Sequence, residues 1–164
     1  MAISKALYMS RSEEWETPED FFHMLDCRLH FTLDPCANAE NAKCQRFFTK
    51  SDDGLTQSWS GERVFMNPPY GKQIGLWMQK ARQEAQAGAL VVCLVHARTD
   101  TRWWHKHVQE AADEVYFVRG RLKFLTGKKA RLTAPFPSAV VVYLPKTNTN
   151  ALQLGKPWKQ NTTA

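Results

Sequence analysis

The chain has 164 residues, 43% of them hydrophobic and 23% charged, which allows one well-buried domain and leaves too little for two. It contains no apolar run near the roughly 20 residues of a membrane-spanning helix. Its first residues are too mixed for a secretory signal, so we expect a cytoplasmic protein. The net charge of +6 favours a polyanionic partner.

The four cysteines, Cys27, Cys36, Cys44 and Cys93, have no C-x-x-C spacing. This pattern predicts reduced thiols and no bound metal. A metal site made by the first three cysteines with a nearby histidine is the less favoured alternative.

Hydrophobic periodicity and turn residues predict a series of alternating elements. In chain order these are a helix opened by Thr17 and Pro18 and running to about Leu29, a strand at 31–34, a short helix at 39–47, a strand at 63–67, a helix at 74–87, a strand at 89–95, a helix at 101–112, and strands at 114–118 and 139–144.

Alternating strands and helices predict βαβ units and an α/β domain with a mostly parallel sheet. We assign residues 13–145 to this single domain, with a poorly ordered N-terminus (1–12) and a polar, disordered tail (146–164). Sheets of this kind bind ligands beyond the carboxyl ends of their strands. Two predicted strands end in polar turns with proline, at Asp34-Pro35 and at 67–70, so we expect the chemistry there.

The turn Asn67-Pro68-Pro69-Tyr70 has the residue types needed to activate an aromatic amine. The exocyclic nitrogen of adenine is a poor nucleophile because its lone pair is delocalised into the ring. The side-chain oxygen of Asn67 and the carbonyl of Pro68 are two acceptors for that amine, and the prolines hold them in place. Tyr70 provides a flat face for a base taken out of the duplex. In isolation these residues also fit a proline turn beside a core tyrosine, but their position between an apolar strand and an amphipathic helix favours a site.

The chain resembles the phage-type family of DNA N6-adenine methyltransferases (Dam-like). The resemblance is carried by an ordered set of stretches across most of the chain: Trp15 to Pro18, Leu33 to Cys44, Asp53 to Leu55, Asn67 to Tyr70, His96 to Trp104 and Gly120 to Phe124. It implies a compact Rossmann-like, S-adenosylmethionine-dependent methyltransferase fold whose last strand is antiparallel. It also implies a DNA methyltransferase specific for the N6 amine of adenine, working in the cytoplasm of a bacterium or a phage-infected host.

The resemblance further assigns contacts with S-adenosylmethionine to three stretches. They are Trp15, Thr17 and Pro18, which pack on the donor; Asp34, Pro35 and Cys36, with the acid near the methionine amino group; and Asp53, Gly54 and Leu55, near the adenine of the donor. For the two acids, capping or turn formation is the structural alternative.

This chain departs from the broader superfamily in the loop after Asp34, which lacks Gly-x-Gly and has Cys36, Ala37, Asn38 and Ala39 instead. The interval from Asp34 to Asn67 is short for two βα units, so we expect one strand to be stunted or missing. The donor ribose is assigned to either Glu40 or Asn41, without a choice between them.

Basic residues concentrate in the second half of the chain and predict a phosphate-binding rim for double-stranded DNA, with a solvated surface as the alternative. They are Arg98, Arg102, Arg119, Arg121, Lys123, Lys128, Lys129 and Arg131. Phe124 either stacks on the target base or belongs to the core. Because no long insertion is present, base readout is expected from residues 125–137 or from a second subunit, in a monomer or a homodimer.

Two rival functions remain open at the level of sequence. Protein or small-molecule amine methylation also suits Asn67–Tyr70, although the basic charge disfavours it. A DNA-binding protein that keeps the fold without turnover is compatible with the glycine-poor loop, although the intact motif disfavours it.

Overall fold

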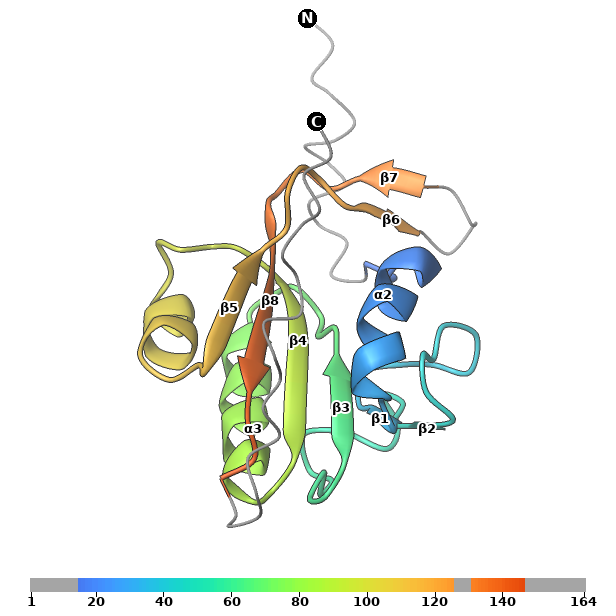
Figure 1. Ribbon diagram of the computed structural model, residues 1–164, viewed down its shortest axis with the longest axis vertical. Helices are drawn as coiled ribbons and strands as arrows, with labels where there is room; N and C mark the ends of the chain where they lie inside the picture. The colour runs from blue at the N-terminus through green and yellow to red at the C-terminus, as the bar shows by residue number, and fades with distance from the viewer. Residues whose placement is uncertain (1–14, 126–130, 147–164) are drawn as a thin grey trace, which may run out of the picture.

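The computed structural model describes residues 15–125 and 131–146, and its main feature is a six-stranded sheet (Figure 1). The strand order is β2-β1-β3-β4-β8-β5. The strands are β1 (Leu33–Asp34), β2 (Arg46–Phe47), β3 (Arg63–Met66), β4 (Leu90–His96), β5 (Glu114–Phe117) and β8 (Ser138–Tyr143). A separate hairpin joins β6 (Lys123–Leu125) to β7 (Arg131–Thr133).

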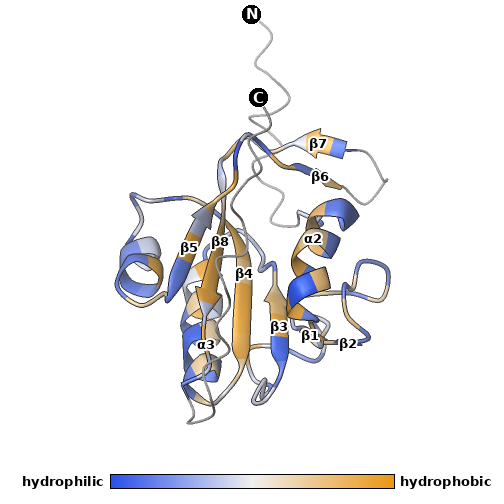
Figure 2. Cartoon of the chain, viewed as in Figure 1, coloured by the Kyte–Doolittle hydropathy of each residue, from blue (hydrophilic) through white to orange (hydrophobic). Residues whose placement is uncertain are grey.

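Strands β1 to β4 run parallel, whereas β8 is antiparallel to both of its neighbours, β4 and β5. The expected mostly parallel sheet with an antiparallel last strand is therefore confirmed. Strands β4 and β8 are almost wholly buried and apolar, as Figure 2 shows along the centre of the sheet.

Helices cover both faces of the sheet. Helix α3 (Ile74–Gln86) lies behind it in Figure 1 and buries Trp77, Met78 and Ala81. Helix α2 (Glu19–Leu29) lies in front, where the ring centroids of Phe22 and Phe65 of β3 are 5.1 Å apart. The predicted helix at 101–112 is present as a short helical segment whose centre, Trp104–Gln109, is a π-helix (η1).

The short helix expected at 39–47 is wrong: residues 39–45 form turns and Arg46–Phe47 is strand β2. Asn38 Oδ1 accepts from the backbone N–H of Glu40 and of Asn41, while Asn41 Oδ1 accepts from the N–H of Asn38. These side chains satisfy backbone groups that a helix would need, which stabilises a turn instead. Strands β1 and β2 have two residues each, in agreement with the stunted strand expected in this interval.

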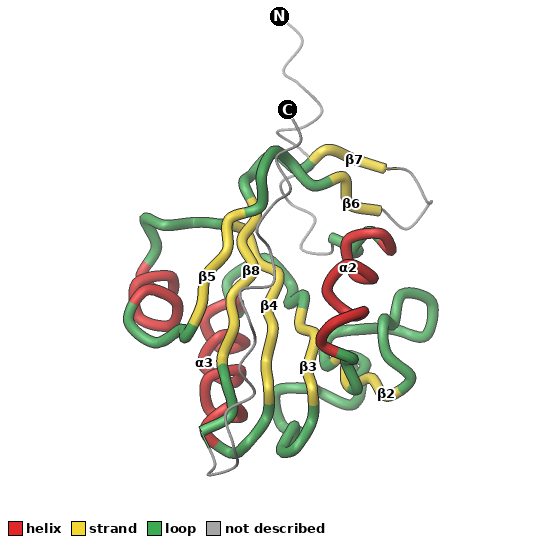
Figure 3. The backbone as a smooth tube through the Cα atoms, in the orientation of Figure 1, coloured by secondary structure: helices red, strands yellow, loops and turns green. Residues whose placement is uncertain are grey.

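The β6–β7 hairpin replaces what the sequence presented as a loop at 125–137. Phe124 pairs with Leu132, and Glu16 pairs with Leu125 through an isolated bridge that attaches the N-terminal segment to β6. Figure 3 shows the hairpin above the carboxyl ends of β3 and β4, among the loops that leave the sheet there.

The predictions for residues 1–12 and for nearly all of 146–164 lie outside the described residues. No helix within 15–125 and 131–146 is both long and apolar enough to span a membrane.

Candidate active site

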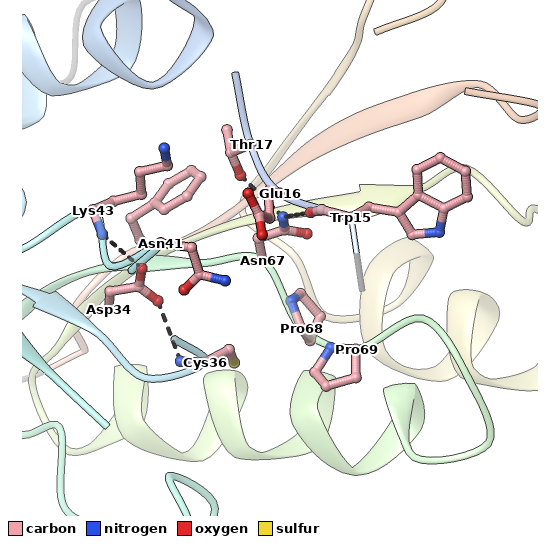
Figure 4. A pocket seen from close by; sticks show the side chains of 11 residues that line it. Trp15, Glu16, Thr17, Asp34, Cys36, Asn41, Lys43, Asn67, Pro68 and Pro69 are labelled. Carbon is pink, nitrogen blue, oxygen red and sulfur yellow. Dashed lines mark hydrogen bonds between the residues drawn. The ribbon is translucent and has the colours of Figure 1, made fainter. Parts of the chain in front are cut away.

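The turn from Asn67 to Tyr70 lies at the carboxyl end of β3, beside the end of β1. Leu33 pairs with Val64, so Asp34 and the residues after β3 meet at the same edge of the sheet. Asp34 and residues 67–69 line one small pocket together with the 15–17 segment (Figure 4). Its walls are Trp15, Glu16, Thr17, Asp34, Cys36, Asn41, Lys43, Phe65, Asn67, Pro68 and Pro69.

The side-chain amide of Asn67 is held by its nitrogen. Asn67 Nδ2 donates to the carbonyl oxygen of Trp15 at 2.5 Å and to Thr17 Oγ1 at 3.0 Å. Asn67 Oδ1 is buried and has no hydrogen-bond partner among the described residues. A buried acceptor without a partner is costly, and Asn67 is one of the residues that line the pocket.

Asp34 is a buried carboxylate, only 5% exposed. Its Oδ1 accepts from the N–H of Cys36 at 3.2 Å and its Oδ2 from the N–H of Lys43 at 3.1 Å. Burial raises the pKa of Asp34 to about 6, although these two backbone hydrogen bonds and the charge of Lys43 act in the opposite direction. A buried anion of this kind is suited to a cationic ligand group.

A larger cavity of about 430 Å³ adjoins this pocket and shares Cys36, Asn41 and Pro69 with it. Its remaining walls include Pro35, Asp53, Gly54, Leu55 and Trp77. The structure therefore brings all three predicted donor-binding stretches to two adjoining spaces, with Pro18 just outside them in a third hollow that borders α2 and β6.

Asp53 shapes the second loop through its own backbone and side chain. It has a left-handed φ of 52°, and its Oδ1 accepts from the N–H of Leu55 at 3.3 Å. The Asp53 side chain is exposed and lines the cavity. It therefore forms a turn, as the structural alternative held, and is also accessible to a ligand.

Three residues of these walls were missed by the sequence analysis or left undecided. Asn41 lines both spaces, whereas Glu40 is exposed and lines neither. Lys43 extends toward α2 and pairs with Glu19. Trp77 stacks on Trp59, and its buried indole N–H has no partner among the described residues. Only the tertiary fold places Lys43 and Trp77 here, because the local sequence around each residue predicts only a helix.

Tyr70 is more buried than expected for a residue that stacks on an incoming base. The residue is 8% exposed, and its hydroxyl donates to the carbonyl of Leu94 at 3.1 Å. His96 stacks on it with the ring centroids 4.7 Å apart, and Trp103 stacks on His96 at 5.6 Å. Burial lowers the pKa of His96 to about 4, so the imidazole is neutral near pH 7. His96 was in a motif of the resemblance but had been given no role.

Phe124, which was placed among the DNA-binding residues, belongs to the core in this structure. It is 0% exposed and packs edge-on against Trp15, with 5.6 Å between ring centroids. Phe136 of the segment after β7 closes the same cluster. The ring is buried because β6 pairs with the 15–17 segment through the Glu16–Leu125 bridge. Local sequence does not predict this pairing.

The predicted basic rim gathers at the active-site end of the sheet. Its described members follow β4 or β5 or lie in the hairpin, and all are exposed: Arg98, Arg102, Arg119, Arg121, Lys123 and Arg131. None of them forms an ion pair with another residue of the described ranges. Lys128 and Lys129 lie outside the described residues.

A parallel sheet with one reversed strand, and with an Asn-Pro-Pro-Tyr turn and a buried acid at its carboxyl edge, defines a Rossmann-like methyltransferase. Comparison with known proteins agrees. The family model of DNA N-6-adenine-methyltransferases (Dam) matches residues 4–157. The chain therefore belongs to the DNA N-6-adenine-methyltransferase (Dam) family, and it is an adenine-specific DNA methyltransferase.

Two phage proteins illustrate the similarity. The chain is 28% identical over 148 residues to the DNA N-6-adenine-methyltransferase of Haemophilus phage HP1, a match that covers 88% of this chain and 86% of that protein. It is 26% identical over 133 residues to the DNA N-6-adenine-methyltransferase of Escherichia phage T1, covering 71% of this chain and 56% of that protein.

Proposed function

We propose that the enzyme takes the methyl group from S-adenosylmethionine bound in the two adjoining spaces, and that Asn67 presents the target adenine of double-stranded DNA to it. The observation that carries the proposal is the buried, unpartnered Asn67 Oδ1 in the wall of a pocket that also contains the Asp34 carboxylate. Asn67 Oδ1 can accept a hydrogen bond from an amine, and the Asp34 carboxylate can pair with an ammonium group.

The donor-binding residues fit the two ends of the donor. In the small pocket Asp34 faces the methionine ammonium, and Trp15 and Thr17 contribute to the same walls. In the larger cavity Pro35, Cys36, Asp53, Gly54 and Leu55 hold the nucleoside, and Asn41 at the junction meets the ribose. When bound, S-adenosylmethionine supplies an electrophilic methyl group on a positively charged sulfur.

The reaction requires alignment of the amine rather than an acid or a base with an unusual pKa. Asn67 Oδ1 and the Pro68 carbonyl accept the two N6 hydrogens of adenine, which turns the nitrogen lone pair toward the methyl carbon. The lone pair forms the new carbon–nitrogen bond as the carbon–sulfur bond breaks, and the sulfur keeps that electron pair. The N6 cation then loses one proton to solvent water, which leaves N6-methyladenine.

Tyr70 provides the stacking surface for the base, with Pro69 beside it. Because Tyr70 is only 8% exposed and its ring carries His96 on one face, stacking requires the neighbouring rings to shift when the base enters. The exposed basic residues Arg98, Arg119, Arg121 and Lys123 hold the phosphates on either side.

The test is transfer of a radiolabelled methyl group from S-adenosylmethionine to unmethylated duplex DNA, followed by mass spectrometry of the nucleosides. We expect N6-methyladenine as the labelled product and no label in a protein extract. Label in protein with unlabelled DNA would overturn the proposal in favour of amine methylation of proteins. Donor binding without transfer to either would support a non-catalytic DNA-binding role.

A further inference from the structure

The orientation of the Asn67 amide is determined by a segment from the other end of the sequence. Both hydrogen bonds of Asn67 Nδ2 go to the 15–17 segment, to the Trp15 carbonyl and to Thr17 Oγ1. Rotating the amide by half a turn would place Oδ1 against the Trp15 carbonyl, where two acceptors would face each other. These two contacts therefore fix Oδ1 as the amide atom that is left without a hydrogen-bond partner among the described residues.

Thr17, which accepts from Asn67 Nδ2, is buried, with 2% of its surface exposed. The segment that carries it is tied to β6, because the N–H of Glu16 donates to the carbonyl of Leu125 and the N–H of Leu125 donates to the carbonyl of Glu16. Side chains alternate along such an extended segment, so Trp15 and Thr17 lie on the side opposite Glu16. The Trp15 ring anchors that side against Phe124 and Phe136.

We propose that Thr17 is a positioning residue for methyl transfer: with the Trp15 carbonyl it holds the Asn67 amide in the orientation that presents Oδ1 to the target amine. The β6–β7 hairpin supports this arrangement through the Glu16–Leu125 pair. The inference rests on the proposed role of Asn67. It differs from a donor-packing role for Thr17, because the Thr17 hydroxyl acts on the amide and not on the donor.

The experiment compares Thr17→Val, which removes the hydroxyl and keeps the branched shape, with Thr17→Ser, which keeps the hydroxyl. Thr32→Val is the matched control, because the Thr32 hydroxyl accepts from the N–H of Arg63 at the opposite end of β3. The single-turnover rate is measured at saturating donor and DNA, and donor affinity separately by calorimetry. We expect Thr17→Val to be slower by about tenfold, the effect of one lost hydrogen bond. Thr32→Val should keep a near-normal rate, and Thr17→Ser should keep more of the rate than Thr17→Val. Thr17→Val should lose more in saturated rate than in donor affinity.

Each outcome has a distinct meaning when Asn67→Ala is included. A normal single-turnover rate in Thr17→Val together with an inactive Asn67→Ala would overturn the positioning role and leave the proposed active site intact. Weakened donor binding in Thr17→Val at an unchanged saturated rate would overturn it in favour of donor packing. An active Asn67→Ala would instead contradict the proposed function. If Thr17→Val melts too early to assay, Thr17→Ala against Thr17→Ser provides the same single-hydroxyl comparison.

Discussion

Gly54 and Pro35 join the two loops of the larger cavity by direct backbone contact. A Cβ atom at Gly54 would lie 2.3 Å from the carbonyl oxygen of Pro35, much closer than two such atoms can approach. Trp59 holds the loop from the other side, because its indole N–H donates to the Gly54 carbonyl at 3.0 Å. Only glycine allows this approach, so the width of the proposed nucleoside site depends on it.

The first prediction concerns this contact. Gly54→Ala should separate the two loops, lower the free energy of unfolding by about 1–3 kcal/mol and weaken donor binding. Calorimetry with S-adenosylmethionine and a thermal melt measure the two effects. Gly75→Ala is the control: a Cβ there would meet Trp103 Cβ at an ordinary 3.4 Å, so donor binding should hardly change. Stability should not fall, because alanine favours the helix more than glycine does. Normal donor affinity in Gly54→Ala would show that the loops do not form the site.

Asp34 should make donor binding dependent on pH. Its pKa is raised to about 6 in the folded protein, so the carboxylate proposed to face the donor ammonium becomes protonated as the pH falls below about 6. Donor affinity should then fall by about tenfold for each further pH unit. Asp34→Asn should weaken donor binding by about 10- to 100-fold at pH 7.5 and remove this pH dependence, with DNA binding little affected.

The sign for stability is the opposite of that for donor binding. A carboxyl group whose folded pKa lies above its unfolded value of 3.8 binds more protons in the folded state over that interval. The Asp34 contribution to stability therefore decreases as the pH rises from about 4 through about 6. Denaturant unfolding of the parent protein near pH 4 and near pH 7 measures this change. Asp34→Asn does not isolate it, because asparagine has only one acceptor for the N–H groups of Cys36 and Lys43. For donor binding, the same pH profile in the parent protein and in Asp34→Asn would show that Asp34 is not part of the donor site.

The basic residues of the hairpin should govern the salt dependence of DNA binding. Each phosphate contact contributes about 0.9 to the slope of log affinity against log salt, so replacing Arg121 and Lys123 by alanine should lower that slope by about 1.8. Arg82 and Lys106 are exposed on α3 and η1 and give a control with the same loss of charge. Equal slopes for the two double variants would place the DNA surface elsewhere.

Asn67→Ala should reduce the rate of methyl transfer by about 10²–10³-fold, because one preorganised acceptor of the transition state is lost. Donor affinity should remain near normal, since the proposed donor contacts come from other residues. Single-turnover transfer and calorimetry on the same preparation separate the two quantities. A near-normal transfer rate would exclude Asn67 as the residue that activates the amine.

Tyr70→Phe should keep most of the activity and lose some stability. The ring that stacks is retained, whereas the buried Leu94 carbonyl loses its partner at a cost of about 1 kcal/mol. Tyr70→Ala should also lose about 1–3 kcal/mol of base stacking and the packing of a ring in the aromatic core. A fluorescent base analogue at the target position reports extrusion separately from chemistry. Unchanged extrusion in a folded Tyr70→Ala protein would contradict stacking on this ring.

Much of the sheet and the central motif could be predicted from local sequence. Strand β4 is buried on both faces, so its sequence is a continuous apolar run. Helix α3 is buried on one face, so its apolar residues recur at helical spacing. Each pattern predicts its own element. The position of Asn67 after β3 followed in the same way, since the prolines end the strand. A parallel sheet then brings Asp34 and Asn67 to one edge, whatever the loops do.

Only the tertiary structure decided how these residues are oriented and what surrounds them. The turn at 39–45 depends on side-chain hydrogen bonds between Asn38 and Asn41 that compete closely with a helix. Phe124 is buried because β6 pairs with the segment of Trp15, and the two residues are more than 100 positions apart in the sequence. The same pairing holds the segment whose Trp15 carbonyl and Thr17 hydroxyl contact Asn67. Local sequence does not encode such pairings, because their stability arises from surfaces that meet only after the chain has folded.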